Sequence, residues 1–353
     1  MDWHSAGMLD REVAYYKYLY KLGVSTTFIS YGNKLDLDLA EKIYPIKICC
    51  NKWGLPRRIF ELFIPVLFNT IFKSAEIIKS NQLFGSEFAL RTGQIFNKPV
   101  IIRNGWLVSK TLELKGDSKK FLIKVRKLEK KIFSNTKSVI VTTDLMKDEI
   151  IQRYKTDNNK INIIPNYIRT EIFKPMSVQK EYDAIYVGRI EKEKNPEIFL
   201  KTISKFKFKA LIIGKGSLKN ELQKRYKYLK KNIRWIDSVP NNKLPEYYNK
   251  SKVYIIPSKY EGHPKTLLEA MACGIPVIGA DVMGIRDIIS DKSNGLLYDG
   301  TTEDLIRNLN QLLANSELQI KIIDNARKFI KKNYDIKNIA NEEYKLLGKL
   351  ACI

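Results

Sequence analysis

The chain has 353 residues, enough for two ordinary domains, because a single hydrophobic core stops growing at roughly 250 residues. Its longest apolar stretch, residues 59–72, is interrupted by polar residues and is shorter than the roughly 20 residues of a membrane-spanning helix. The formal net charge of +24 indicates nucleic acid, an anionic membrane surface or phosphorylated substrates as partners, and it is spread over both halves of the chain rather than held in one basic tail.

The first half, residues 1–175, alternates short β-branched runs with helical segments, which is typical of an α/β domain. The stretch "MDWHSAGMLD" has no apolar core behind a basic start, so it does not resemble a signal peptide and we expect the protein in the cytoplasm. The strands expected in this half lie at residues 24–32, 43–50, 75–82, 98–105, 138–143 and 161–166.

Residues 115–137 hold nine basic and two acidic side chains, with apolar residues at helical spacing. This pattern predicts an amphipathic cationic helix, and such helices can lie on anionic lipid. A helix packed on the domain's core with a solvated lysine face fits the same pattern. Together with the apolar residues from Ile59 on, the helix favours a protein at the inner face of the cytoplasmic membrane.

The second half repeats the α/β alternation more clearly, and we place the linker near residues 170–181, where periodicity is lost. We expect one doubly wound domain at residues 176–334 and a final helix at residues 335–353 that packs back on the N-terminal domain. Expected strands lie at residues 183–190, 209–216, 233–238, 252–258, 276–282 and 294–299. Expected helices lie at residues 196–206, 217–231, 242–250, 264–274, 284–289 and from 317 on.

The segment "EGHPKTLLEAMACG", residues 261–274, places two glutamates eight positions apart around an apolar helical run. A helix that begins near Pro264 and ends at Gly274 carries Lys265, Thr266 and Glu269 on one face. That face could point to solvent. Because the segment lies between two runs apolar enough to be central strands, the helix could instead direct its first-turn N–H groups at an anion or a sugar hydroxyl.

The stretch "PSKYEGHPKTLLEAMACGIPVIGADVMGIRDII" resembles the donor-site signature of the retaining glycosyltransferases of family 4, which share the GT-B fold of two facing Rossmann-like domains. The resemblance continues through "YVGRIEKEKNPEIFL", "LIIGKGSLKNELQ" and "NGLLY", and it covers nearly all of residues 183–334. In the first half it is looser and is carried by "AGMLDREVAYYKYLYKLGV", "KPVIIRNGW" and "IIPNYI".

The resemblance implies a transfer of a hexose from a nucleotide-sugar to a saccharide or lipid-linked acceptor with retention of configuration, in synthesis of a cell-surface polysaccharide or lipopolysaccharide. Glu269 would bind the ribose hydroxyls, and Glu261 would touch the transferred sugar. A carboxylate suits both roles because it only accepts hydrogen bonds. The other donor-binding residues implied are Gly188, Gly214, Gly262, His263, Lys265, Thr266 and Leu267. His263 and Pro264 depart from the commoner E-G-F-G opening, which bears on the identity of the donor sugar.

Arg189 and Lys194 match the family's pair that holds the diphosphate, and with Glu261 they are the expected catalytic residues. Two fixed cations would neutralise charge on the leaving nucleoside diphosphate. The four cysteines and two histidines show no metal-ligand spacing, so we expect no metal and no cofactor. The resemblance implies no committed protein nucleophile and a transfer of the acceptor's proton to the leaving phosphate oxygen, so we name no general base. Arg103 stands where many members have a histidine, and it is a candidate for the acceptor side or for a structural role.

Other functions fit the same residues. A nucleotide-sugar epimerase or a phosphorylase would share the fold, and a basic nucleic-acid-binding protein is suggested by the charge alone. No nucleic-acid recognition motif is present, so we expect no nucleic-acid partner.

The first residues also depart from the family's opening strand, because they begin in what resembles the acceptor-side loop with Gly7. We therefore expect the N-terminal domain to lack its first strand; the alternative is a rearranged sheet that closes without it.

Overall fold

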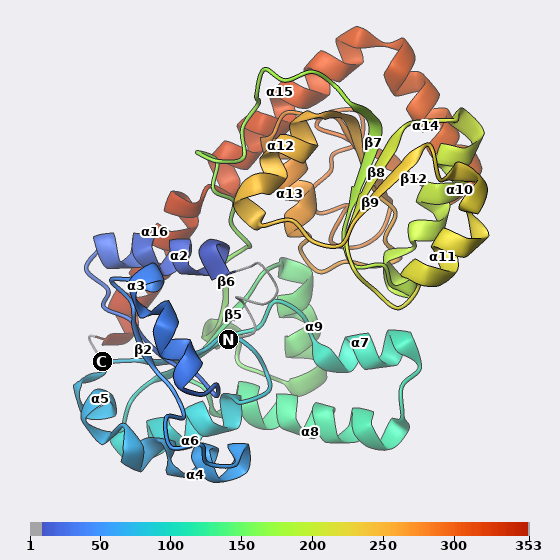
Figure 1. The fold of residues 1–353 in the computed structure, drawn as a ribbon. Coiled ribbons are helices and arrows are strands. Elements are labelled where there is room, and N and C mark those ends of the chain that lie inside the picture. The colour runs from blue at the N-terminus through green and yellow to red at the C-terminus, as the bar shows by residue number, and fades with distance from the viewer. Residues whose placement is uncertain (1–8, 352–353) are drawn as a thin grey trace. The chain divides into compact units, whose positions relative to one another are not determined.

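The computed structural model describes residues 9–351, which form two compact α/β units (Figure 1). The first unit holds Val13–Pro165 and the residues from Ile339 on, and the second holds Asn166–Asn338 together with residues 9–12. Residues 166–175, which we predicted to end the N-terminal domain, lie in the second unit. None of the helices in the described part of the chain combines the length and the apolar character needed to cross a membrane.

The second unit contains one parallel six-stranded sheet with the order β12-β11-β10-β7-β8-β9. Its strands are β7 (Tyr182–Val187), β8 (Ala210–Ile213), β9 (Ile233–Ile236), β10 (Ser251–Ile256), β11 (Val277–Ala280) and β12 (Leu296–Tyr298). Helices cover both faces: α12 (Leu244–Asn249), α13 (Lys265–Ala272) and α15 (Ser316–Asn333) lie on one, and α10 (Pro196–Phe206), α11 (Lys219–Arg225) and α14 (Thr302–Ala314) on the other (Figure 1).

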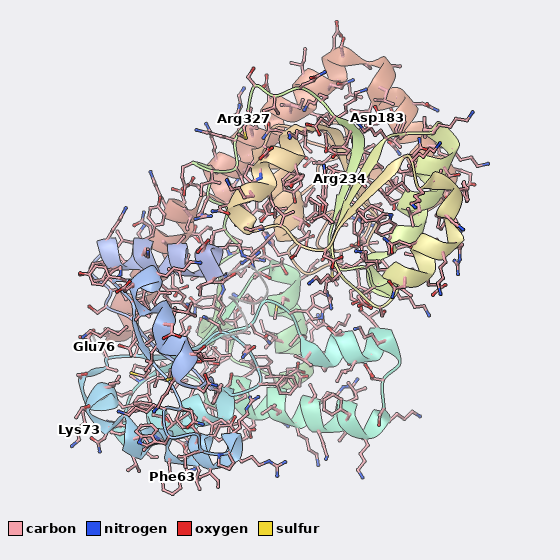
Figure 2. All side chains as sticks on the ribbon, viewed as in Figure 1. Phe63, Lys73, Glu76, Asp183, Arg234 and Arg327 are labelled. Atoms are coloured by element: carbon pink, nitrogen blue, oxygen red, sulfur yellow. The ribbon has the colours of Figure 1, made fainter. Side chains whose placement is uncertain are left out.

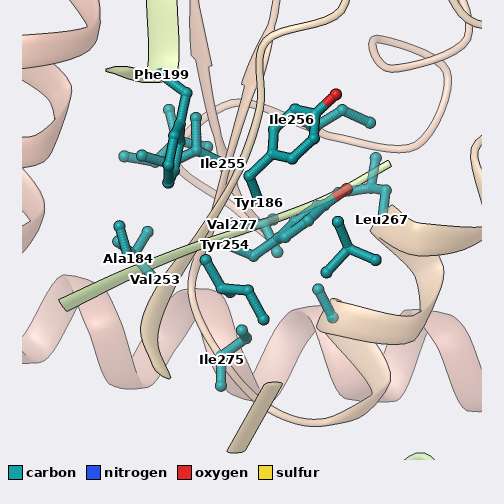
Figure 3. Close-up of a cluster of buried hydrophobic side chains, with 14 of the residues drawn as sticks. Ala184, Tyr186, Phe199, Val253, Tyr254, Ile255, Ile256, Leu267, Ile275 and Val277 are labelled. Atoms are coloured by element: carbon teal, nitrogen blue, oxygen red, sulfur yellow. The ribbon is translucent and has the colours of Figure 1, made fainter. Parts of the chain in front are cut away.

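Most residues of these strands are apolar because both faces of the sheet are covered. Every residue of β8 and of β11 is buried. Figure 3 shows part of the resulting core, in which Tyr186 of β7 and Tyr254 of β10 lie among aliphatic side chains, with Leu267 of α13 nearby. The core therefore fixes the ends of β7 and β10, from which the candidate site is built.

The first unit has six short parallel strands in two sheets, with the orders β1-β2 and β3-β4-β5-β6. Its strands are β1 (Thr27–Ile29), β2 (Lys47–Cys49), β3 (Ile78–Ser80), β4 (Val100–Arg103), β5 (Ser138–Val141) and β6 (Ile161–Ile163). Its helices are α3 (Ala40–Ile43), α4 (Arg57–Leu67), α5 (Asn69–Ser74), α6 (Ser86–Phe96), α7 (Val108–Lys115), α8 (Lys119–Asn135) and α9 (Asp144–Tyr154). Helix α2 (Leu9–Lys21) begins in the second unit and continues into the first.

Each strand predicted from the sequence is present, whereas two helix predictions need correction. Residues 284–289 are predicted to be helical, but residues 284–288 form turns; Gly284 has a φ of +80°, which is outside the right-handed helical region. The predicted helix 217–231 is shorter and ends in a 3₁₀ turn at Lys227–Leu229. No described strand joins the β1-β2 sheet to the other four strands, so the predicted alternative of one closed, rearranged sheet is wrong for the described residues.

The final helix, α16 (Ile336–Ala351), brings a buried carboxylate into the first unit. Glu343 is fully buried and accepts hydrogen bonds from Tyr15 Oη at 2.7 Å and from Lys79 Nζ of β3. Arg103 Nη1, at the end of β4, lies 3.8 Å from Glu343 Oε2. Burial pushes the pKa of Glu343 upward, but Lys79 and Arg103 outweigh it and hold this pKa below its ordinary value.

We expect Glu343→Gln to lower the free energy of unfolding at neutral pH by on the order of 3 kcal/mol, because Lys79 and Arg103, whose side chains are only 14% exposed, would lose their counter-charge. The folded pKa of Glu343 is lowered, so its contribution is complete above the unfolded value of about 4.3 and is lost as the pH falls through the folded pKa. Urea unfolding should therefore show a difference in the free energy of unfolding between wild type and variant that is largest at pH 7 and becomes smaller in acid.

Glu342→Gln is the matched control, because Glu342 is the exposed neighbour of Glu343 in the same helix. It should change the free energy of unfolding by less than about 0.5 kcal/mol. Equal stability of the Glu343→Gln variant and the wild type at pH 7 would contradict the proposed role of the ion pair.

Candidate functional site

The candidate site lies where the strand order of the second unit reverses. Strand β7 is central, the chain proceeds outward through β8 and β9 on one side, and it returns to β10 on the other. Ligands of such sheets bind beyond the carboxyl ends of the strands at this reversal. The segments that leave these two ends are residues 188–195 after β7 and residues 257–264 after β10, and they carry most of the predicted donor-binding residues.

The structure brings Lys194 and Glu261 together although 67 positions separate them. Lys194 Nζ donates to Glu261 Oε1 at 2.7 Å, and the Oγ of Ser258 donates to the same oxygen at 2.7 Å. Both of these hydrogen bonds are accepted by Oε1 of Glu261. The side chains of Lys194 and Glu261 are 20% and 11% exposed, so the pair is mostly desolvated, and two donors hold Glu261 Oε1.

Arg189 lies on the same segment as Lys194 but reaches into solvent. Its side chain is 65% exposed and pairs with Glu193 at 3.1 Å. The Oη of Tyr186 donates to the carbonyl of Arg189 at 2.7 Å, which fixes the backbone at the point where the chain leaves β7. The backbone of Arg189 is therefore held in place, and its guanidinium is accessible.

Two glycines allow the backbone segments of the site to approach closely. A Cβ on Gly214, which follows β8, would lie 1.8 Å from the carbonyl oxygen of Gly188. Gly284 has a φ of +80°, and a Cβ there would lie 2.4 Å from the carbonyl oxygens of Glu261 and Gly262. Substitution of either glycine would displace the segments that carry Arg189 and Glu261.

Helix α13 buries Glu269 instead of exposing it. Glu269 is 1% exposed, and its two oxygens accept from Asn241 Nδ2 at 2.9 Å and from Tyr248 Oη at 3.1 Å. Burial raises the pKa of Glu269, although Arg11 and the two hydrogen bonds lower it in part. The alternative that this face of the helix points to solvent is wrong.

The first turn of α13 is held by side chains of the second unit. The Oη of Tyr254 donates to Thr266 Oγ1 at 2.8 Å, and Leu267 is fully buried. Lys265 Nζ lies 3.1 Å from Glu12 Oε1. Burial opposes ionisation of Glu12, but Lys265 and Arg11 lower its pKa to about 2, so the carboxylate is charged at neutral pH.

His263 is part of the packed wall of the site. It is 8% exposed, its ring meets the ring of Tyr334 edge-on at 5.1 Å, and its carbonyl oxygen accepts from Asn166 Nδ2 at 2.7 Å. Asn241, Tyr248 and Ser258 are not among the site residues predicted from the sequence. Ser258 could have been found from its position three residues before Glu261, but no spacing rule connects Asn241 or Tyr248 to Glu269.

The two residues predicted for the acceptor side are Arg103 and Gly7. Arg103 Nη2 donates to the carbonyl oxygen of Pro165 at 3.0 Å, and Nη1 pairs with Glu343, so the contacts of Arg103 are those of a structural residue of the first unit. Gly7 lies outside the described residues. Within residues 9–351, no three His, Cys, Asp or Glu side chains are grouped so that they could hold a metal ion.

Comparison with known proteins connects this site to one family. Residues 168–329 match the family model described as glycosyl transferases group 1. An α-1,4-N-acetyl-D-galactosaminyltransferase of Campylobacter jejuni, named for an undecaprenol-linked saccharide, is 30% identical over 199 residues, which are 54% of this chain and 55% of that protein. The amylovoran biosynthesis glycosyltransferase AmsD of Erwinia amylovora is 30% identical over 210 residues, 56% of this chain and 59% of that protein. The chain thus matches little more than half the length of these curated relatives.

Solved structures resemble both units. A glycosyltransferase from Rickettsia africae superimposes with a TM-score of 0.78 and 18% identity, covering 98% of this chain and 95% of that one. Anabaena Alr3699/HepE in complex with UDP-glucose gives a TM-score of 0.76 at 16% identity, covering 92% of each chain. These neighbours are GT-B proteins with two Rossmann-like domains. Residues 168–329 are thus similar to the glycosyl transferases group 1, and the fold of the chain is GT-B.

Proposed function

We propose that the protein is a glycosyltransferase that moves a hexose from a nucleotide-sugar to a glycan or lipid-linked acceptor with retention of anomeric configuration. The observation that carries the proposal is the Lys194–Glu261 pair at the strand reversal, with Arg189 on the same segment and the buried Glu269 on the adjoining helix. The two curated relatives are named for glycan synthesis, which supports a role in building a cell-surface polysaccharide.

The diphosphate of the donor would lie against Arg189 and Lys194. The ammonium of Lys194 has three N–H donors and gives one to Glu261, so it can reach phosphate oxygens without leaving its partner. The exposed guanidinium of Arg189 can approach the same phosphates with its planar donor fork. The N–H groups of Thr266 and Leu267, in the first turn of α13, would add dipoles of the same sign.

The two glutamates would bind the two sugar parts of the donor. The hydrogen bonds of Glu261 go to Oε1, so Oε2 faces no donor among the described residues and can accept from the transferred sugar. Each oxygen of Glu269 has two lone pairs and uses one for Asn241 or Tyr248, so the other can accept from a ribose hydroxyl.

In the proposed reaction, the bond between the anomeric carbon and the phosphate oxygen breaks, and the acceptor oxygen bonds to the same face of that carbon. The acceptor's proton moves to the leaving phosphate oxygen, so no side chain serves as general base. Arg189 and Lys194 stabilise the negative charge that develops on the nucleoside diphosphate. We propose that these cations replace a metal ion.

A screen of UDP-, GDP- and ADP-sugars tests the function directly. We expect release of nucleoside diphosphate from one class of donor, and transfer of the labelled sugar to a saccharide or lipid-linked acceptor with the donor's anomeric configuration. An epimerised nucleotide-sugar formed without acceptor, or a sugar phosphate formed only with inorganic phosphate, would identify an epimerase or a phosphorylase instead.

Removal of one cation should slow the chemical step. We expect Arg189→Ala and Lys194→Ala each to lower kcat by about a hundredfold, because a preorganised charge at the leaving group is lost. Lys192→Ala is the matched control, since Lys192 is an exposed lysine of the same segment, and its kcat should stay within about twofold of wild type. Unchanged kcat in both site variants would refute the assignment.

Loss of the buried carboxylate should weaken binding of the nucleotide. We expect Glu269→Gln to reduce the affinity for UDP or GDP by about 1–3 kcal/mol, because the amide presents a donor where two ribose hydroxyls need acceptors. Calorimetric titration measures the affinity, and a thermal melt reports whether the variant folds. Tyr248→Phe retains the carboxylate and should lose less affinity; a folded Glu269→Gln protein with wild-type affinity would show that Glu269 does not bind ribose.

Chelation should have little effect on turnover. With Arg189 and Lys194 as the counter-charges, we expect EDTA to change kcat by less than about twofold. If EDTA abolishes turnover and Mg²⁺ restores it, the proposal of a metal-free reaction is wrong.

A further inference from the structure

Helix α4 of the first unit has apolar side chains on both its inner and its outer face. Its inner residues Phe60 and Ile64 pack with Phe68 and Phe72 in a small core beneath the helix. Its outer residues are Ile59, Leu62, Phe63 and Val66, which are 44%, 48%, 46% and 69% exposed. Figure 2 shows Phe63 pointing away from the ribbon at the outer surface of the unit.

The outer residues form one continuous arc. At 100° per residue, positions 58, 62, 66, 59 and 63 lie within about 140° of the helix circumference, and of these only Arg58 is charged. The single acidic residue of α4, Glu61, is 8% exposed and is held by Arg57 at 2.9 Å on the inner side. A solvated helix would carry its polar residues on this arc, so the arc is suited to an apolar environment.

Basic and aromatic groups surround the arc. Residues 47–76 contain five basic side chains and two acidic ones, and one of the acidic ones is the paired Glu61. Trp53 is 44% exposed, its ring lies 5.9 Å from that of Phe68, and Lys52 Nζ lies 5.1 Å from the Trp53 ring centroid. An indole with a neighbouring ammonium suits the boundary between headgroups and acyl chains.

We propose that the outer arc of α4 (Ile59, Leu62, Phe63 and Val66), which we call the α4 face, docks on an anionic lipid bilayer, with Arg58, Lys52 and Trp53 at the headgroup level. The apolar side chains supply the buried area, and the excess of positive charge favours anionic headgroups over a neutral surface. This proposal does not depend on the transfer reaction, because it concerns binding to lipid alone.

The α4 face replaces the cationic helix as the main expected contact. In α8 the apolar residues Val125, Ile132 and Phe133 are buried in the core, as in the core-packed alternative of the sequence analysis. Phe121 and Ile123, both near its N-terminus, are 45% and 52% exposed. Most of the outer side of α8 is therefore lysine, which can add attraction to anionic lipid but little apolar insertion.

Cosedimentation with vesicles tests the proposal. The wild-type protein should bind vesicles of mixed phosphatidylglycerol and phosphatidylcholine more tightly than vesicles of phosphatidylcholine alone. The double variant Leu62→Glu, Phe63→Glu should bind the mixed vesicles at least about tenfold more weakly. It replaces two apolar side chains that insert into the bilayer by two carboxylates, which the anionic lipid repels. Both positions are exposed, so the variant should keep the wild-type thermal melt.

Ile320→Glu is the matched control, because Ile320 is a 63% exposed aliphatic residue of α15 in the second unit. Its vesicle binding should remain within about twofold of wild type. Vesicle binding at the wild-type level by the α4 double variant would overturn the proposal. That result would assign the contact to α8 if replacement of Lys120, Lys124, Lys127 and Lys131 by glutamine abolished binding. A concentration-dependent dimer that the double variant abolishes, without any binding of wild type to lipid, would assign the α4 face to a second copy of the chain and also overturn the proposal.

Discussion

The parallel pairing of β7 with β10 is the constraint on which the candidate site depends. Tyr182 pairs with Ser251 and Ile185 with Tyr254, so the two strands end side by side. Their connections then proceed in opposite directions across the sheet. This arrangement lets Lys194, at the end of the short 3₁₀ turn Lys192–Lys194, meet Glu261 at 2.7 Å.

The buried core makes that pairing rigid. Tyr186 and Tyr254 carry their hydroxyls to the ends of the strands, where one bonds to the carbonyl of Arg189 and the other to Thr266. Burial raises the pKa of both phenols, so they act as fixed donors and stay neutral. Two tyrosines of the core thus set the backbone of one loop and the first turn of one helix, and the site inherits its geometry from the sheet.

The sequence was sufficient to predict the strands and the similarity to the glycosyl transferases, because both depend on local patterns: β-branched runs, and motifs with characteristic spacing such as residues 257–289. It was insufficient for the partners of those motifs. Asn241 of the 3₁₀ turn Asn241–Lys243 and Tyr248 of α12 bind Glu269 from elements that precede β10 in the chain, and Glu343 contacts Lys79 across 264 positions. Contacts of this kind are set by the tertiary fold, and a single sequence has no periodicity that reports them.

Glu269 and Glu343 show how burial separates a candidate ligand-binding carboxylate from a structural one. Both are almost completely buried, but the two cations in contact with Glu343 lower its pKa, whereas burial raises the pKa of Glu269 and is only partly opposed by Arg11 and by its neutral direct partners. A buried carboxylate with neutral donors has its charge only partly compensated, so further donors stabilise it. The hydroxyls of a bound sugar would supply such donors to Glu269, while Glu343 has its charge already matched by Lys79 and Arg103. The difference in partners, rather than in burial, therefore favours Glu269 as the residue that interacts with a ligand.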